Sequence, residues 1–152
     1  MPQIDIASAP ERKGSNYPAP FDKPCAARVR KALGDAAGLN DFGVNLLHLP
    51  PGAWSSQRHW HRGEDEFVFV VSGEVVLVTD AGEAVLRAGD CAGFPKGLSD
   101  GHHLINRSAT TVVCLEVGTR TQGDICTYSD IDMQIDDEIG RYARKDGTLY
   151  AQ

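Results

Sequence analysis

Residues 52–106, GAWSSQRHWHRGEDEFVFVVSGEVVLVTDAGEAVLRAGDCAGFPKGLSDGHHLIN, are a succession of short apolar runs separated by glycine-containing turns. The runs at 67–71 and 75–78 are rich in β-branched and aromatic residues, with Ser72 and Gly73 between them. This pattern predicts two strands joined as a hairpin. Further strands are expected on either side, with no long helical segment between them, so the sequence predicts an all-β sandwich or barrel.

The composition is that of an ordinary globular domain. The chain has 152 residues, of which 41% are hydrophobic and 24% charged, so we expect one folded unit with its own core. The formal net charge of −6 argues against a nucleic-acid partner, because phosphate binding needs a basic surface. No apolar run approaches the roughly 20 residues that span a membrane. We therefore expect a cytoplasmic protein with no nucleic-acid partner and no membrane attachment.

The pattern divides the chain into three parts. Residues 1–20 are rich in proline and lack core periodicity, which predicts an N-terminal arm. Residues 21–120 carry the strands of the barrel, although 26–37 fits either a helix or an edge strand. Residues 121–152 are polar and acidic, and we expect an extension that packs on the barrel or on a partner subunit. The arm, the ambiguous segment and the extension together predict a homodimer.

Two histidines and a glutamate stand at a spacing that suits one metal ion. His59 and His61 alternate with Trp60 on an expected strand, so both imidazoles point to the same face. Glu66 lies at the start of the next strand, where its carboxylate can reach the same centre. Imidazoles with one carboxylate favour a divalent transition metal (Fe, Mn, Ni or Zn) over Ca or Mg. The same spacing also fits two half-exposed histidines beside a surface glutamate.

The wider spacing resembles the two conserved motifs of the cupin superfamily. The first motif is Gly52-x6-His59-x-His61-x4-Glu66-x6-Gly73, and the second is Gly89-x5-Pro95-x-Gly97-x4-His102-x3-Asn106. The resemblance implies a cupin double-stranded β-helix, which is a jelly-roll barrel. It also implies that one divalent metal is held by His59, His61, Glu66 and His102.

The second motif departs from the usual cupin pattern in one respect that concerns the metal. The turn before His102 is two residues longer than usual, which leaves His103 as the alternative ligand. The spacing to Asn106 favours His102, which would share its strand face with Leu104.

Four other residues are expected on the substrate side of this centre. Gln57 should lie beside His59, where its amide could orient a substrate or a metal-bound water. Val68 and Leu104 are expected to make the cavity wall apolar, as ligand sites usually are. Lys96 lies in a turn of the second motif and is the cation expected near an anionic substrate.

The resemblance implies a metal-binding protein that acts on a small organic molecule, and small cupins of this kind are labelled sugar-phosphate-isomerase-like. An isomerase needs a metal that polarises a carbonyl and a base that moves a proton. The sequence suggests only Lys96 and Arg107 as phosphate partners. An Fe(II)-dependent oxygenase, which needs only an apolar pocket, and a non-catalytic small-ligand-binding module are the alternatives.

Overall fold

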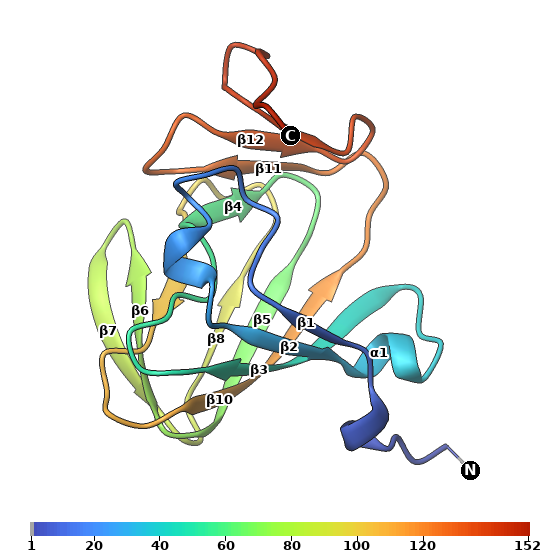
Figure 1. Cartoon of the computed structure of the whole chain (residues 1–152), viewed down its shortest axis with the longest axis vertical. Helices are drawn as coiled ribbons and strands as arrows, with labels where there is room; N and C mark the ends of the chain where they lie inside the picture. Colours follow the sequence, from blue (N-terminus) through green and yellow to red (C-terminus); the bar gives the residue numbers. More distant parts are fainter. Residues whose placement is uncertain (1) are drawn as a thin grey trace.

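The computed structural model describes residues 2–152 and consists almost entirely of antiparallel strands (Figure 1). Thirteen strands form three sheets, and the helical segments are short. These segments are the 3-10 turns η1 and η2 and the helix α1, at Ile6–Ser8, Lys23–Cys25 and Leu33–Ala36. The all-β jelly-roll barrel that the sequence predicts is confirmed.

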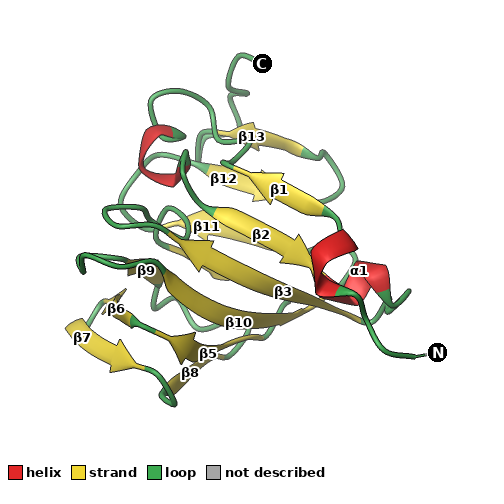
Figure 2. Ribbon diagram, turned by 60° about the horizontal axis from the view of Figure 1, so that its bottom comes forward, coloured by secondary structure: helices red, strands yellow, loops and turns green. Residues whose placement is uncertain are grey.

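The largest sheet has six strands in the order β1-β2-β3-β10-β5-β8. Their bounds, in that order, are Glu11–Lys13, Val29–Ala32, Phe42–Leu49, Val112–Thr119, Glu66–Ser72 and Cys91–Phe94. Figure 2 shows this sheet as a curved layer, with β1 and β2 continuing it beyond β3. The sheet forms the wall of the barrel on which the metal-ligand candidate Glu66 stands.

Two smaller sheets complete the molecule. The three-stranded sheet has the order β7-β6-β9, with bounds Gly82–Arg87, Glu74–Thr79 and His103–Ile105. The four-stranded sheet has the order β13-β12-β11-β4, with bounds Arg141–Ala143, Gln134–Asp136, Ile125–Tyr128 and His59–His61. This second sheet joins the C-terminal segment to the strand that carries two of the candidate histidines.

The hairpin predicted for residues 67–71 and 75–78 is wrong. β5 pairs with β10 and β8, whereas β6 pairs with β7 and β9 in the three-stranded sheet. At Gly73 the chain passes from one sheet to the other with a φ of 86°, which favours glycine. A Cβ at that position would lie only 3.1 Å from Val112 Cγ2. A glycine between two apolar runs is equally compatible with a hairpin turn and with a corner at which the chain leaves one sheet for another.

The segment that fits either a helix or an edge strand contains both. Val29–Ala32 forms β2, whose register with β3 aligns Val29 with His48. The single-turn helix α1 follows directly, and Gly34 in it lies against Val44 of β3. Within residues 26–37, the alternating pattern therefore corresponds to strand β2, and the helical spacing corresponds to the turn of helix α1 that follows it.

The main core lies between the six-stranded and the three-stranded sheets. Its strand residues lie two apart along each strand, because successive side chains alternate between faces. Its buried members are Leu47, Leu49, Ala53, Val68, Val70, Val75, Leu104, Val112 and Cys114. Most of these residues fill the barrel, and Val68 and Leu104 also reach the cavity at the histidines.

A second, smaller core ties both ends of the chain to the barrel. It is formed by Cys126, Tyr128 and Met133 of the C-terminal segment, with Tyr17 and Phe21 of the N-terminal segment packed against them. The rings of Tyr17 and Tyr128 meet edge to face, with 5.5 Å between their centroids. The two ends therefore pack on this chain's own barrel. Within residues 2–152 the structure has no helix long and apolar enough to cross a membrane.

Candidate metal centre

Three short segments place the four candidate ligands at one end of the barrel. His59 and His61 are the ends of β4, and Glu66 is the first residue of β5. His102 precedes β9 and pairs with His59 through two backbone hydrogen bonds, His59 N–H to His102 O (3.2 Å) and His102 N–H to His59 O (2.9 Å). This bridge sets the register of the second motif and turns the His102 side chain toward the other two imidazoles.

The Nε2 atoms of all three histidines converge on the carboxylate of Glu66. Glu66 Oε2 lies 2.8 Å from His102 Nε2 and 3.5 Å from His59 Nε2. Glu66 Oε1 lies 3.5 Å from His61 Nε2. The structure therefore brings together all four residues that the cupin resemblance implies as ligands.

The donor set fits a transition metal. Glu66 Oε2 is buried and accepts no hydrogen bond from residues 2–152, despite its closeness to His102. A buried carboxylate oxygen without a donor is costly, and a cation shared with the imidazoles would remove that cost. Three imidazoles and one carboxylate are a ligand set that suits Fe, Mn, Ni or Zn. The four residues would hold such an ion and leave other coordination positions open.

The outer nitrogens of two histidines have acceptors that orient the rings. His59 Nδ1 lies 2.9 Å from Gln57 O, and His61 Nδ1 lies 2.6 Å from Asp124 Oδ2. We assign the ring proton to Nδ1 in both residues, which leaves the Nε2 lone pairs free for a metal. The His102 ring stacks on Phe94 with an interplanar angle of 2°. Each ring is thus held by a hydrogen bond or by stacking.

The charges of the cluster are strongly coupled. Burial alone would raise the pKa of Glu66, but its contacts with His102, His59 and His61 lower that pKa well below its usual range. Burial opposes the charged form of His61, yet Glu66 and Asp124 outweigh it and raise the pKa of His61 to about 9. Burial lowers the pKa of His102. The centre therefore keeps an ionised carboxylate that attracts cations.

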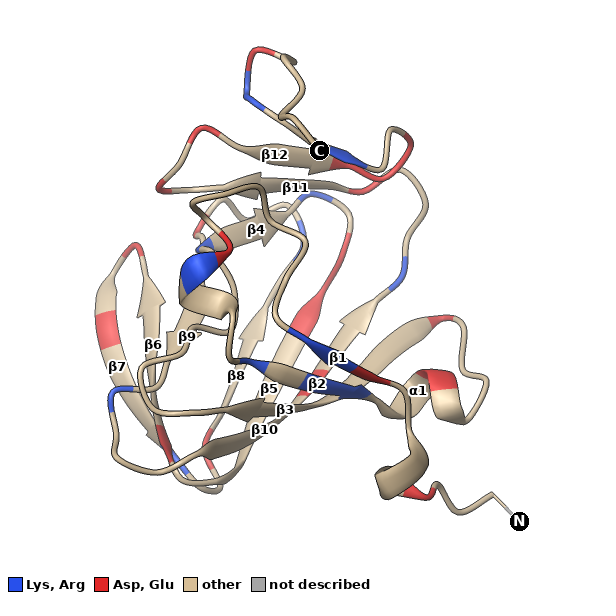
Figure 3. Ribbon diagram, viewed as in Figure 1, with Lys and Arg blue, Asp and Glu red and all other residues tan. Residues whose placement is uncertain are grey.

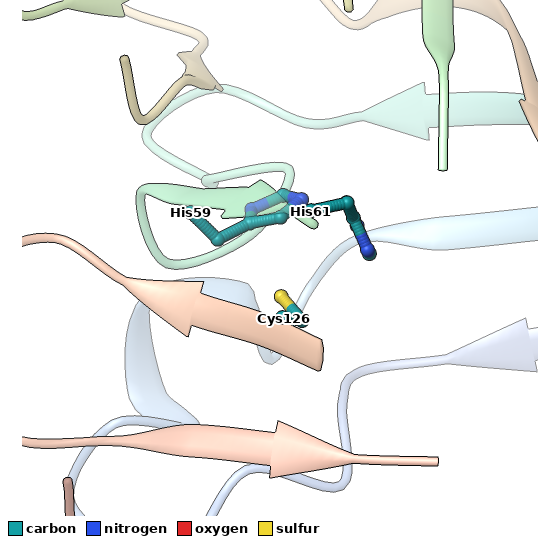
Figure 4. Close-up of side chains that lie close together, drawn as sticks. All are labelled: His59, His61 and Cys126. Carbon is teal, nitrogen blue, oxygen red and sulfur yellow. The ribbon is translucent and has the colours of Figure 1, made fainter. Parts of the chain in front are cut away.

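Cys126 lies beside the two histidines of β4 (Figure 4). It is the register partner of His61 on β11, and its sulfur lies within 4.8 Å of a ring nitrogen of both His59 and His61. Burial raises the pKa of this thiol, which disfavours the thiolate that binds metals. The carboxylate of Glu66 is the better fourth ligand.

Two cavities meet at this centre. The larger has a volume of about 370 Å³ and includes His59, Glu66 and His102 in its lining. The smaller, about 170 Å³, adjoins His61, Glu66 and His102. The remaining lining of the smaller cavity is mainly apolar, with Trp60, Leu77, Ala92, Phe94, Pro95 and Leu98. An ion held by the four residues would be reached from both cavities.

The other residues expected at the site are divided between the cavity and its surroundings. Val68 and Leu104 line the larger cavity. Gln57 is buried, and its amide Nε2 donates to Phe21 O at 2.8 Å, so it anchors the N-terminal segment. Lys96 is exposed and lies outside the lining of both cavities. His103 also lines the larger cavity, but its ring packs edge to face on Trp54, its Nδ1 lies 2.9 Å from Ser56 O, and it is not among the described residues that contact Glu66.

Comparison with known proteins agrees with the geometry. The structure superposes on a sugar phosphate isomerase from a cupin superfamily of Silicibacter pomeroyi DSS-3 with a TM-score of 0.94, at 45% identity, covering 98% of this chain and 96% of that chain. This chain belongs to the cupin superfamily. A cupin domain family model matches residues 45–118 of this cupin, which span both histidine motifs.

Two further solved structures have lower identity to this cupin. A protein of Acidithiobacillus ferrooxidans ATCC 23270, proposed as a sugar phosphate isomerase, is 29% identical over 93% of this chain and 90% of its own, with a TM-score of 0.77. A predicted oxalate decarboxylase of Thermotoga maritima, with 21% identity, 78% and 99% coverage and a TM-score of 0.63, shares the fold alone. No protein with a curated description matches this cupin.

Two groups of residues at the centre of this cupin are missed by reasoning from the sequence. Asp124 holds His61 but stands 63 residues further along, in a segment without strand periodicity. Arg28 and Arg30 line the larger cavity, although no role at the site was predicted for them from the sequence. The alternation of Arg28, Val29 and Arg30 was the one available signal that both arginines share a face.

Proposed function

We propose that this cupin is a metal-dependent enzyme that interconverts the aldose and ketose forms of a small phosphorylated sugar. The observation that carries the proposal is the convergence of three Nε2 atoms on Glu66 where two cavities meet. The 45% identical protein named a sugar phosphate isomerase supports the choice of reaction. Fold alone would not support it, because one fold carries many reactions.

The four converging residues would hold one divalent ion, either Fe, Mn, Ni or Zn. Such an ion would supply a Lewis acid that polarises a carbonyl oxygen of the sugar. Asp124 and the carbonyl of Gln57 keep the ring nitrogens of His61 and His59 aimed at the ion. Val68 and Leu104 add apolar side chains to the otherwise polar lining of the larger cavity, where the carbon chain of a sugar could lie.

The reaction is tested by following aldose–ketose interconversion of three- to six-carbon sugar phosphates by the full chain loaded in turn with each metal. We expect turnover that the His59→Ala variant loses by at least about a hundredfold. The matched control is His48→Ala, since His48 lies on β3 outside the cluster. Absence of turnover with every metal and sugar phosphate would refute the isomerase.

The smaller cavity favours a second candidate function, an Fe(II)-dependent oxygenase. Its lining beside His61 and Glu66 is mainly apolar, which suits oxygen and an apolar substrate. Oxygen consumption by the Fe(II)-loaded chain with phenols, diketones and thiols separates this function from isomerisation. If neither reaction occurs while the metal binds, the protein is a non-catalytic module that binds a small ligand.

We also propose a cytoplasmic homodimer. Phe67, Phe69 and Val71 stand two apart on β5 and are 41%, 37% and 49% exposed. An apolar row of this kind on a barrel wall is suited to cover by a second copy. Light scattering at micromolar concentration should give twice the mass of the 16.4 kDa chain. A single monomeric species would contradict the dimer.

A further inference from the structure

Three arginines gather on one wall of the larger cavity. Arg12 of β1 and Arg30 of β2 are register partners, and Arg28 lies two residues before Arg30. All three line the cavity that also reaches Glu66. Figure 3 shows the basic segments of β1 and β2 lying side by side. The neighbouring strands thus build a cationic surface facing the metal centre's cavity.

The three arginines differ in what balances their charge. Arg30 makes a two-pronged ion pair with Glu116, with Nε to Oε1 at 2.7 Å and Nη2 to Oε2 at 3.0 Å. Arg28 is only 7% exposed and has no carboxylate partner among residues 2–152. Its Nε donates to Gly14 O at 3.0 Å and its Nη1 to Ser55 O. Arg12 makes no ion pair or side-chain hydrogen bond with the part of the chain that is described.

Burying the charge of Arg28 with no carboxylate partner in the described chain is costly. Like charges directly opposite each other on paired strands are destabilising, and here Arg12 faces Arg30. Burial and the neighbouring Arg30 lower the pKa of Arg28, since both disfavour its charge. Glu116 pairs with one of the three guanidinium groups, so within residues 2–152 Arg12 and Arg28 have no carboxylate partner of their own. The two carbonyl oxygens that accept from Arg28 carry no net charge and leave its Nη2 group free of an acceptor in the described part of the chain.

We propose that Arg12 and Arg28, with the Arg30–Glu116 pair beside them, form the subsite for the phosphate group of a phosphate monoester. Such a group carries a charge of about −1.5 to −2 at pH 7, which suits two guanidinium groups without a carboxylate partner in residues 2–152 better than one carboxylate does. Guanidinium groups bind phosphate oxygens through paired hydrogen bonds. The subsite deepens the proposed function, because it names the groups that hold the substrate's phosphate.

Glu66 of the metal centre and Glu116 of the subsite stand close together on neighbouring strands. Glu116 is the register partner of Val68, and Val68 stands two residues along β5 from Glu66. Strand geometry then places the Cα atoms of Glu66 and Glu116 about 8 Å apart. Both glutamates and the arginines line the larger cavity, so one short-chain sugar phosphate in that cavity would place its carbonyl end at the centre and its phosphate at the arginines.

The test is calorimetric titration of inorganic phosphate into the full chain, both metal-loaded and after chelation. We expect saturable binding in both states, weakened at least about tenfold in Arg12→Gln and in Arg28→Gln. Lys96→Gln and Arg107→Gln are matched controls, because Lys96 is exposed outside the cavities and Arg107 pairs with Glu83. Both controls should bind phosphate as the wild type does.

Arg12→Gln keeps the test decisive if Arg28→Gln fails to fold, because Arg12 is exposed and makes no ion pair with residues 2–152. Equal phosphate affinity of the wild type and Arg12→Gln, or binding that requires the metal, would overturn the subsite. Acetate that binds as tightly as phosphate would overturn the monoester assignment. The titration measures phosphate binding and needs no turnover. Failure of the proposed isomerase activity can therefore be told apart from failure of the phosphate subsite.

Discussion

Asp124→Asn tests whether a residue that does not bind the metal itself supports the centre by orienting the ligand His61. The Asp124 carboxylate is 3% exposed and accepts two hydrogen bonds. One comes from His61 Nδ1 at 2.6 Å and the other from the Gly63 amide at 2.7 Å. Asparagine has nearly the same shape but only one side-chain oxygen, so it can accept only one of these two hydrogens.

Either orientation of the asparagine amide harms the centre. If its oxygen faces His61, the Gly63 N–H meets an NH2 group and is left unsatisfied, at a cost of about 1–3 kcal/mol in folding free energy. If its NH2 group faces His61, the ring proton moves to Nε2, the atom that faces Glu66. Loss of such an outer partner weakens metal binding about 10- to 100-fold, which corresponds to about 1.4–2.7 kcal/mol.

The assay is competition for one divalent metal between the full chain and a chromophoric chelator. We expect Asp124→Asn to fold, with the weaker affinity given above. Asp146→Asn is the matched control, because it makes the same charge change at an exposed turn whose Thr148 amide an asparagine can still bind. An Asp124→Asn variant with a metal affinity within twofold of the wild type and an unchanged free energy of unfolding would refute the argument that Asp124 orients His61.

Three further outcomes follow from packing, titration and binding. Leu47→Ala should lower the free energy of unfolding by about 2–5 kcal/mol, because Leu47 is fully buried. The control Leu98→Ala should change it by less than about 0.5 kcal/mol, because Leu98 is exposed. Urea titration measures both free energies, and equal losses would contradict the core assignment. Burial raises the pKa of Cys114 to about 12, so its thiolate stays scarce between pH 7 and 9. Of the four cysteines, only exposed Cys91 should be alkylated rapidly in that range. Fast labelling of Cys114, detected by mass spectrometry, would contradict this expectation. Metal at about a hundred times its Kd should stabilise the fold by about 2.7 kcal/mol and raise Tm by about 5–10 °C; calorimetry with an unchanged Tm would exclude a metal specific to the folded state.

Much of the site could be predicted because its residues are close in sequence. His59 and His61 share a strand face by simple alternation, and Glu66 begins the next strand. The choice of His102 over His103 depends on register, which the backbone bridge to His59 decides in the structure. Local spacing thus predicted three of the candidate ligands and the all-β class, whereas His102 and the jelly-roll barrel were implied by the resemblance to cupins.

The rest depends on contacts between distant segments. Asp124 reaches His61 only because β11 pairs with β4. No periodic pattern in the sequence predicts that pairing. Arg12 meets Arg30 because the N-terminal segment adds β1 to the sheet, where the sequence predicts only an arm. The wrong hairpin at Gly73 has the same origin, since partners of β5 and β6 come from elsewhere in the chain. Strand pairing at long range is a property of the whole fold.

Three histidines, His102 among them, and Glu66 are proposed to hold one metal ion. The metal content of the purified full chain, measured by mass spectrometry beside His102→Ala and His103→Ala, decides whether they do. We expect about one equivalent of a transition metal in the wild type and in folded His103→Ala. We expect less than about a tenth of that in folded His102→Ala. Full metal content in His102→Ala, or its loss in His103→Ala alone, would rule out this set of ligands.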